Sequence, residues 1–175
     1  MTKIYTKRGD EGKSSLPNGP IIAKSNPVFA LMGQIDQVNA CIGLLRSEDV
    51  AEYGKEMLME IQRKLMALGS IVAGVDKKSI RDLISAQDVT KLEEEIDEMT
   101  QEMPELRNFI LPNGSRKSAL AHLIRSEIRT LERRIVGYGK IEDKNIVQWI
   151  NRLSDFFFTL ARYFNYNDQI DEIIW

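Results

Sequence analysis

The chain has 175 residues and a formal net charge of −2, so it is long enough to form one domain with a packed core. The weak negative charge excludes a protein whose whole surface attracts nucleic acid, and an apolar content of 43% excludes a disordered chain. Any phosphate or nucleotide site must therefore come from locally clustered lysines and arginines.

The cysteine content and the N-terminal sequence indicate where the protein works. Cys41 is the only cysteine, which excludes a disulfide framework and favours a reducing compartment. The sequence MTKIYTKRGD lacks the apolar segment of a signal peptide, and no apolar run approaches the length of a membrane span. We expect a soluble, cytoplasmic protein that contacts neither membrane nor nucleic acid.

Residues 1–26 differ in composition from the rest of the chain, residues 27–175. Glycine, proline and polar residues predominate there without an alternating strand pattern, so we expect an irregular, flexible arm. Glycines, hydroxyl groups and three cations, which suit the wrapping of phosphates, are combined over Thr6, Lys7, Arg8, Gly9, Asp10, Glu11, Gly12, Lys13, Ser14 and Ser15. An ordinary P-loop is excluded, because Pro17 and Pro20 prevent the long helix that follows such a loop. A disordered tail is the alternative interpretation of the arm.

Apolar residues recur at helical spacing from residue 27 almost to the end of the chain. The spacing predicts four long helices, over about 28–47, 52–73, 115–138 and 143–166. A further helix is expected to begin after Ser85, its N-cap, and Pro104 and Pro112 bracket a non-helical segment around Phe109. These elements predict an all-α protein, a five-helix up-and-down bundle preceded by the irregular arm.

Three arginines share one side of the helix expected over 115–138. Arg125, Arg129 and Arg133 lie four residues apart, so their guanidinium groups form a stripe beside the apolar face. Like charges in register repel, and a bound anion between them would relieve the repulsion. A solvated face with local ion pairs is the alternative interpretation.

The first long helix carries one carboxylate among small residues. Asp36 shares a side with Gly33, Ala40 and Gly43, which allow another helix to approach closely. A charge on a packing surface needs a partner, and Arg125 is the natural candidate. The alternative is that Asp36 is exposed, although its apolar neighbours favour a packed position.

The last helix presents a polar sector and three consecutive phenylalanines. Asn151, Ser154, Asp155, Phe158 and Arg162 fall within one angular sector, for which a polar edge is the simplest explanation. The rings of residues 156–158 point all round the helix, so at least one is expected to face a subunit interface or a large flat ligand.

Several segments, taken in order, resemble the PduO-type ATP:cob(I)alamin adenosyltransferases over nearly the whole chain. KIYTKRGDEGKSSL is similar to the signature K-I-Y-T-x-T-G-D-x-G-x-T/S-S-L, and Lys24 followed by Pro27 is similar to the family's lysine before D-x-P. GQIDQVNACIG and FILPNGS resemble G-x-x-D-E-L-N-S-x-I-G and F-I-L-P-G-G. HLIRSEIRTLERRIV and NRLSDFFFTLARYFN resemble H-x-A-R-x-x-x-R-R-A-E-R-R-V and N-R-L-S-D-x-L-F-x-L-A-R-x-x-N.

The resemblance implies a homotrimer of five-helix bundles that binds ATP between neighbouring subunits, and it assigns roles to individual residues. The nucleotide-contacting positions of the arm would be Thr6, Lys7, Arg8, Gly9, Ser14, Ser15 and Lys24. The phosphate-binding segment of the family would correspond to Arg129, Thr130, Leu131, Glu132 and Arg133, joined by Asn151 from the last helix. Asp36 and Arg125 would form the intersubunit salt bridge, and Phe109 would displace the lower ligand of the corrinoid.

The reaction implied by the resemblance is an in-line displacement. Cob(I)alamin attacks C5′ of ATP, which the resemblance implies is bound together with Mg²⁺, and triphosphate leaves. Cobalt is already a strong nucleophile, so no general base is required, and His122, the only histidine, is expected to serve packing. A reductase and an adenosylcobalamin-dependent enzyme are the partners that such a reaction implies.

Four positions depart from the family pattern. Arg8 replaces a threonine, Gln37 a glutamate, Asn113 a glycine and Thr130 the second arginine of a pair. These departures support an alternative, a non-catalytic member that binds nucleotide or corrinoid as a carrier or sensor. A helical interaction protein with incidental basic stripes is a third hypothesis.

Overall fold

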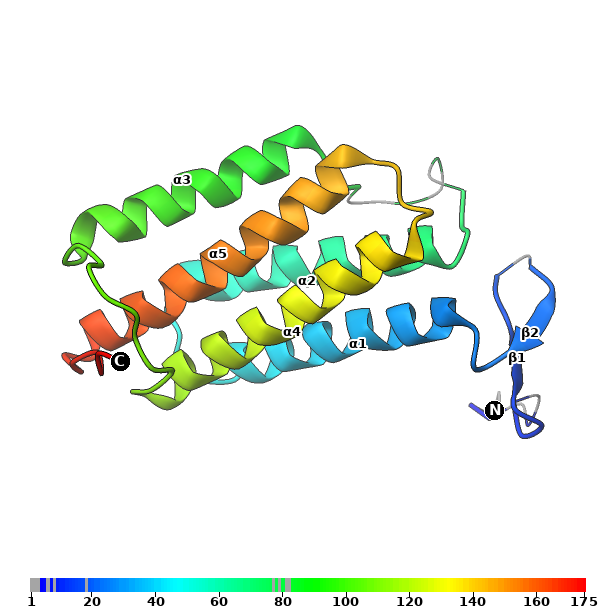
Figure 1. Cartoon of the computed structure of the whole chain (residues 1–175), viewed down its shortest axis with the longest axis horizontal. Helices are drawn as coiled ribbons and strands as arrows, with labels where there is room; N and C mark the ends of the chain where they lie inside the picture. The colour runs from blue at the N-terminus through cyan, green and yellow to red at the C-terminus, as the bar shows by residue number, and fades with distance from the viewer. Residues whose placement is uncertain are drawn as a thin grey trace.

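The computed structural model describes residues 4–5, 7, 9–17, 19–76, 78, 80 and 83–175. Its helices are α1 (Pro27–Arg46), α2 (Glu52–Val72), α3 (Ala86–Glu102), α4 (Arg116–Tyr138) and α5 (Lys144–Asn167), and its strands are β1 (Lys13–Ser15) and β2 (Ile21–Ala23). The helices run alternately in opposite directions along one bundle axis (Figure 1). The prediction of an all-α up-and-down bundle is confirmed.

The order of the helices in space differs from their order in the chain. Helix α1 packs against α2 and α4, and α5 packs against α4 and α3, so α1, α4 and α5 each lie between two other helices. Apolar residues at helical spacing bury the inward faces, among them Ile35, Leu65, Leu92, Ile128 and Phe157. The contact between α4 and α5 is the most extensive of those between the helices.

Local chemistry sets where the helices begin and end. The Asn26 side chain accepts a hydrogen bond from the Val28 N–H, with Pro27 as the first residue of α1. Ser115 and Asp143 cap α4 and α5 in the same way, and Gly139, at φ +66°, ends α4. The helix bounds expected from the sequence are therefore correct to within a residue.

Helix α1 is, among the described helices, the one long and apolar enough to cross a membrane by length and composition. Its apolar residues Val28, Leu31, Ile35, Val38 and Ile42 are buried against the other helices of the bundle. The bundle core therefore accounts for part of the apolar composition of α1, while its Leu44 is exposed.

The arm contains a small sheet that the sequence analysis did not anticipate. Strands β1 and β2 pair antiparallel, with Ser14 opposite Ile22, and the hairpin stands beyond the N-terminal end of α1 (Figure 1). The Gly19 N–H donates to the Leu16 carbonyl in the connecting turn. Three-residue strands are too short to show an alternating pattern, which is why the sequence analysis did not detect them in the otherwise irregular arm.

The loop between α3 and α4 is fixed by one buried asparagine of α5. Asn165 is 2% exposed; its Oδ1 accepts from the Ser115 N–H at 3.1 Å and its Nδ2 donates to the Asn113 carbonyl at 3.0 Å. Gly114 between them has φ +105°, and a Cβ there would lie 2.0 Å from Asn165 Oδ1. Only glycine fits this position, so the loop is locked to the centre of the bundle.

We predict that Gly114→Ala destabilises the protein. Backbone strain at positive φ and loss of the Asn165 hydrogen bonds should lower the free energy of unfolding by about 2–5 kcal/mol. Urea unfolding followed by circular dichroism measures the change. Gly137→Ala is the matched control, because a Cβ there meets nothing within 4 Å, and it should leave stability equal or slightly raised. Equal stability of the two variants would contradict this account of the loop.

A partly buried ion pair joins α2 to the start of α3. Lys64 Nζ lies 2.9 Å from Asp88 Oδ1, both side chains being 14% exposed, and Asp88 Oδ2 accepts from the N–H and hydroxyl of Ser85, the N-cap of α3. Burial acts to raise the pKa of Asp88, but the hydrogen bonds from Lys64 and Ser85 outweigh it and hold the pKa below its usual value.

Asp88→Asn is predicted to cost about 1.5–3 kcal/mol of unfolding free energy at pH 7, because the charged hydrogen bond is lost. The carboxylate's contribution is complete above the unfolded-state pKa of about 3.9, and it is lost as pH falls through the lower folded-state pKa. The difference between variant and wild type should thus stay constant from pH 7 to about 5 and shrink below about 4. Asp97→Asn, at an exposed position of α3, should show no such pH-dependent difference; a difference for Asp88→Asn that persists at low pH would refute the ionic origin.

Candidate functional site

Residues of the last two helices form two facing rows, which we call the α4–α5 seam: His122, Arg125, Arg129 and Glu132 of α4, and Asn151, Asp155 and Phe158 of α5. All of them except His122, for which packing was expected, are residues that the sequence analysis singled out. Asn151 Nδ2 donates to Glu132 Oε1 at 2.9 Å. The Arg125 guanidinium lies 5.3 Å from the centre of the Phe158 ring, and the His122 ring meets the same ring edge-on at 6.1 Å. Antiparallel packing thus places the two sets side by side.

The electrostatics of the seam favour an anion. Burial and, second, the neighbouring Arg129 charge lower the pKa of Arg125, while Asp155 opposes them. Arg125 nevertheless stays charged at neutral pH, because its usual pKa lies so far above 7. Burial and the Arg125 charge also lower the pKa of His122, so the imidazole is neutral at pH 7. Two adjacent guanidinium groups therefore remain partly uncompensated, which is the arrangement that binds phosphate.

A cavity of about 490 Å³ opens at the Asn151 end of the seam, between α3, α4 and α5. Glu132 and Asn151 line it together with the apolar Val89 and Val147. Its volume is within the range of pockets that hold small molecules, and most of its lining is polar or charged, with Glu93, Gln148 and Arg152 beside Glu132 and Asn151. Within the described residues, no group of three or more His, Cys, Asp or Glu side chains is placed to hold a metal ion.

The remaining predicted residues of α4 are arranged along the helix itself. Arg133 Nη2 donates to Thr130 Oγ1 at 3.1 Å, and Thr130 Oγ1 donates to the Ser126 carbonyl at 3.2 Å. Arg133 thus lies along the helix surface. The Leu131 side chain is fully buried in the core, so it positions the helix and offers no side-chain atom to a ligand.

The hairpin gathers part of the predicted arm. A Cβ built on Gly9 would lie 2.9 Å from Lys24 Nζ, and the Lys24 N–H donates to the Gly12 carbonyl at 2.8 Å. Ser14 and Ser15 lie on β1, and Lys7 adopts φ +59°, a conformation that few residues with side chains occupy. Thr6 and Arg8 lie outside the described residues.

The arm stands apart from the seam within one chain (Figure 1). Lys24 and Gly9 lie on the hairpin beyond the end of α1, whereas Arg129, Glu132 and Asn151 lie along α4 and α5. One chain therefore does not bring all the predicted nucleotide-binding residues together.

Asp36 does not occupy the packed position that its apolar neighbours suggested. It is exposed, and Arg125 is half-buried against Phe158 on the seam, so the expected pair is not formed within the described part of one chain. Two contacts set the register of α1 against α4: Gln34 Nε2 donates to Glu127 Oε2 at 2.7 Å, and Arg134 Nη1 to the Ala30 carbonyl at 2.7 Å. In this register Asp36 and Arg125 lie at nearly the same height along the bundle, on different sides of it.

Phe109 lies at the opposite end of the bundle from the hairpin, in the loop that Asn165 fixes. Its ring is 81% exposed and contacts Trp175 edge-on, with ring centres 6.4 Å apart. The sequence analysis did not identify the partners that matter here, Arg162, Glu172 and Trp175, because they come from α5 and the C-terminal segment. It also missed the buried Gln34, for which the sequence offers no signal beyond a polar residue on an apolar face.

Comparisons with known proteins agree with one another. A family model described as cobalamin adenosyltransferase matches residues 4–164. The chain is 37% identical to the corrinoid adenosyltransferase of Bacillus subtilis, over 98% of this chain and 91% of that protein. It is 38% identical to the human corrinoid adenosyltransferase MMAB, over 93% of this chain and 69% of the human protein.

Solved structures give the same result. A phenylalanine-to-alanine variant of a PduO-type ATP:corrinoid adenosyltransferase from Lactobacillus reuteri, in complex with cobalamin and ATP, superposes with a TM-score of 0.89 at 33% identity, over 99% of both chains. An arginine-to-lysine variant in complex with ATP superposes with a TM-score of 0.87, at 33% identity over 98% of this chain and 99% of that one. The resemblance seen in the sequence motifs is confirmed: this chain belongs to the cobalamin adenosyltransferase family and has the fold of its PduO-type members.

Proposed function

We propose that the protein transfers the 5′-deoxyadenosyl group of ATP to cob(I)alamin, forming adenosylcobalamin and releasing triphosphate. The family match and the relative solved with cobalamin and ATP support this reaction. The observation in this chain that carries the proposal is the seam, where the adjacent Arg125 and Arg129 lie on the same helix as Glu132, which lines a cavity together with Asn151.

The reaction forms one bond and breaks one bond. The cobalt electron pair attacks C5′ of ATP, the C5′–O bond breaks, and the bonding electrons leave with the triphosphate. Because the nucleophile needs no proton removed, the protein has to orient two reactants and stabilise negative charge on the leaving group. A neutral, buried His122 and a row of permanently charged arginines fit this division of tasks.

Individual residues take the following roles in this proposal. Arg129 and Arg133 bind the triphosphate, while Glu132 and Asn151, already hydrogen-bonded to each other, bind the ribose. The hairpin of a neighbouring subunit closes over the phosphates with Lys24 and Gly9. Mg²⁺ would arrive on the triphosphate, because that ion is held mostly by phosphate oxygens and water, with at most the Glu132 carboxylate from this chain.

The separation of hairpin and seam supports an assembly with sites between subunits. A homotrimer would let the hairpin of one chain reach the seam of the next, and it would cover the exposed Asp36. Asp36 would then pair with Arg125 across the interface. We place the protein in the cytoplasm as a soluble enzyme, supplied with cob(I)alamin by a reductase and passing its product to an adenosylcobalamin-dependent enzyme.

One observation favours a second candidate function, a non-catalytic carrier or sensor of nucleotide or corrinoid. Thr130 stands where the family has an arginine, and it accepts a hydrogen bond from Arg133, one of the proposed clamps. Anaerobic incubation with ATP and chemically reduced cobalamin separates the candidates. Growth of the cobalt–carbon absorption spectrum supports the enzyme, and nucleotide binding without product supports the carrier. If neither is observed, the third hypothesis, a helical interaction protein, is supported.

Arg129→Ala is predicted to lower kcat by about 10²–10³-fold, because a charge aimed at the leaving group is worth that much in other enzymes. Initial rates of cobalt–carbon bond formation at saturating ATP measure the loss, and circular dichroism checks that the helices are intact. Arg63→Ala, an exposed arginine on α2, is the control and should retain the wild-type rate. A wild-type rate for Arg129→Ala would remove the clamp role.

Asp36→Ala is predicted to weaken the trimer, because it leaves Arg125 without its proposed partner across the interface. Light scattering coupled to size exclusion should show smaller species at micromolar protein. The charge-exchanged double variant, Asp36→Arg with Arg125→Asp, should recover part of the assembly. Asp97→Ala serves as the control, and an unchanged trimer for Asp36→Ala counts against the pair.

A further inference from the structure

We propose that Arg162 is a positioning residue for Phe109: through Glu172 it holds the C-terminal segment, residues 170–175, against residues 109–111. The proposal rests on the proposed function, in which Phe109 displaces the lower ligand of the corrinoid. It concerns residues of α5 and of the C-terminal segment that the reaction itself does not touch.

Arg162 binds two separate segments at one end of the bundle. Its side chain is 7% exposed; Nε donates to Glu172 Oε1 at 2.6 Å, and Nη2 donates to the Pro104 carbonyl at 3.0 Å. Pro104 opens the loop that carries Phe109, and Glu172 belongs to the segment that follows α5. One guanidinium group therefore binds both the loop that carries Phe109 and the segment that follows α5.

The two segments then pair along their backbones. The Leu111 N–H donates to the Ile173 carbonyl at 2.8 Å, and the Trp175 N–H donates to the Phe109 carbonyl at 2.9 Å. Ile110 and Ile174 form an antiparallel bridge between these bonds. The C-terminal segment therefore pairs with the Phe109 loop like a short strand, and Arg162 binds Glu172 just before the paired residues.

The exposure of Phe109 makes this backbone clamp necessary. The ring is 81% exposed and its aromatic neighbour Trp175 is 83% exposed, so core packing does not set the position of either ring. These backbone hydrogen bonds hold the Phe109 main chain, and the partly buried ion pair of Arg162 and Glu172 holds the segment that supplies them. Breaking one partner of a buried ion pair leaves the other uncompensated and loosens what it held.

The proposed role of Phe109 determines which step should suffer. Cob(II)alamin carries a lower ligand that must leave before reduction, whereas pre-reduced cob(I)alamin has already lost it. A loosened Phe109 should therefore slow product formation from cob(II)alamin and leave the adenosyl transfer from pre-reduced cob(I)alamin nearly unchanged. A merely structural role of Arg162 would slow both alike.

The test uses Glu172→Gln in the full-length chain, with Glu60→Gln as the matched control. Glu60 also forms an ion pair between two elements, with Lys91, but it lies on α2 far from Phe109. The readout is the rate with cob(II)alamin and a fixed reductant divided by the rate with pre-reduced cob(I)alamin. We expect this ratio to fall about tenfold or more in Glu172→Gln, since small misplacements of a reacting group cost rates of this order. Glu60→Gln should keep the wild-type ratio.

Amide hydrogen exchange gives a readout independent of activity. In Glu172→Gln, exchange at Leu111 and Trp175, whose N–H groups bond across the clamp, should be faster than in the wild type. Faster exchange together with the lower ratio supports the proposal. Unchanged exchange, an unchanged ratio, or equal losses with both forms of cobalamin overturns it. If wild-type protein makes no product from pre-reduced cob(I)alamin, the proposed function fails, and the exchange result still decides whether the clamp exists.

A second pair of variants covers the case in which Glu172→Gln does not fold. Trp175→Pro removes the N–H that donates to the Phe109 carbonyl, while Trp175→Ala keeps that N–H and removes only the exposed ring. The proline variant should lower the ratio further than the alanine variant. Equal ratios for the two would overturn the backbone clamp.

Discussion

The contact between α4 and α5 determines where the proposed functional groups of these two helices point. Ile124, Ile128 and Leu131 of α4 are fully buried, as are Leu153 and Phe157 of α5, so neither helix can rotate without exposing core side chains. Residues that lie next to these buried rows on the surface of each helix are therefore fixed on the seam. The arginines, Glu132 and Asn151 are thus held in place by the core beside them.

This arrangement has an electrostatic consequence. Arg125 is partly desolvated and lies close enough to Arg129 for the pKa of Arg125 to fall. In a chain without ligand the repulsion is an unfavourable term, which Asp155 offsets in part. A triphosphate would remove it, so binding energy would be realised where charge accumulates as the leaving group departs. Thr130 moderates this, since it replaces one cation and holds Arg133 along the helix.

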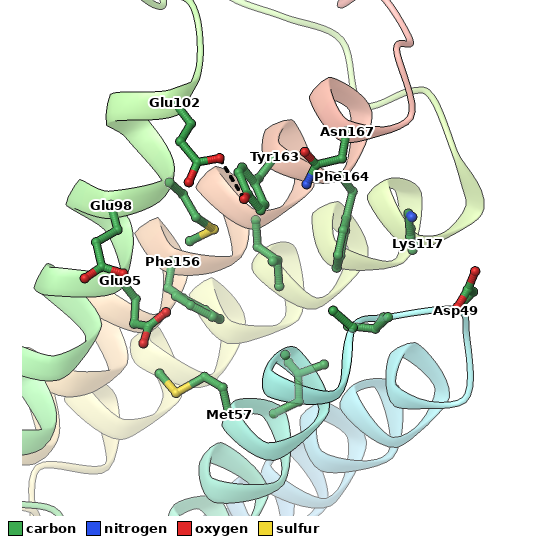
Figure 2. Close-up of a pocket in the computed structure, with 16 residues that line it drawn as sticks. Asp49, Met57, Glu95, Glu98, Glu102, Lys117, Phe156, Tyr163, Phe164 and Asn167 are labelled. Carbon is green, nitrogen blue, oxygen red and sulfur yellow. Dashed lines mark hydrogen bonds between the residues drawn. The ribbon is translucent and has the colours of Figure 1, made fainter.

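A cavity elsewhere in the bundle shows by contrast what the seam provides. It measures about 400 Å³ and lies between α2, α3 and α5, lined by Met57, Phe156 and Phe164 with carboxylates on its α3 side (Figure 2). Glu102 there accepts a hydrogen bond from Tyr163 at 2.9 Å. Its lining carries three α3 glutamates and Asp49 against one cation, Lys117, which is already paired with Asp168, so this cavity disfavours phosphate. The seam cavity is also lined by carboxylates, Glu93 and Glu132, so the seam differs in the adjacent Arg125 and Arg129 charges on the same helix as Glu132.

The sequence allowed the helices to be predicted because their apolar periodicity extends over many turns and their caps are local. The hairpin was not predicted because Lys13–Ser15 and Ile21–Ala23 are each too short to show the two-residue alternation of a strand. The exposure of Asp36 escaped for a different reason: small residues predict a close approach, but they do not say whether the approaching helix belongs to the same chain. Arg162 and Glu172 were missed as a pair because only the turn after α5 brings them together.

Helix α5 relates the two ends of the molecule. Asn151 lies in its first half beside the nucleotide-sized cavity, and Arg162 lies eleven residues later, roughly 16 Å along the axis, where it holds the Phe109 loop and the C-terminal segment. Asn165, one turn further along α5, holds the same loop through side-chain hydrogen bonds to the backbone of Asn113 and Ser115. A reaction that joins cobalt to a sugar carbon needs its two reactants held at a constant separation. A single helix, buried along most of its length, supplies that constancy better than two loops that move independently.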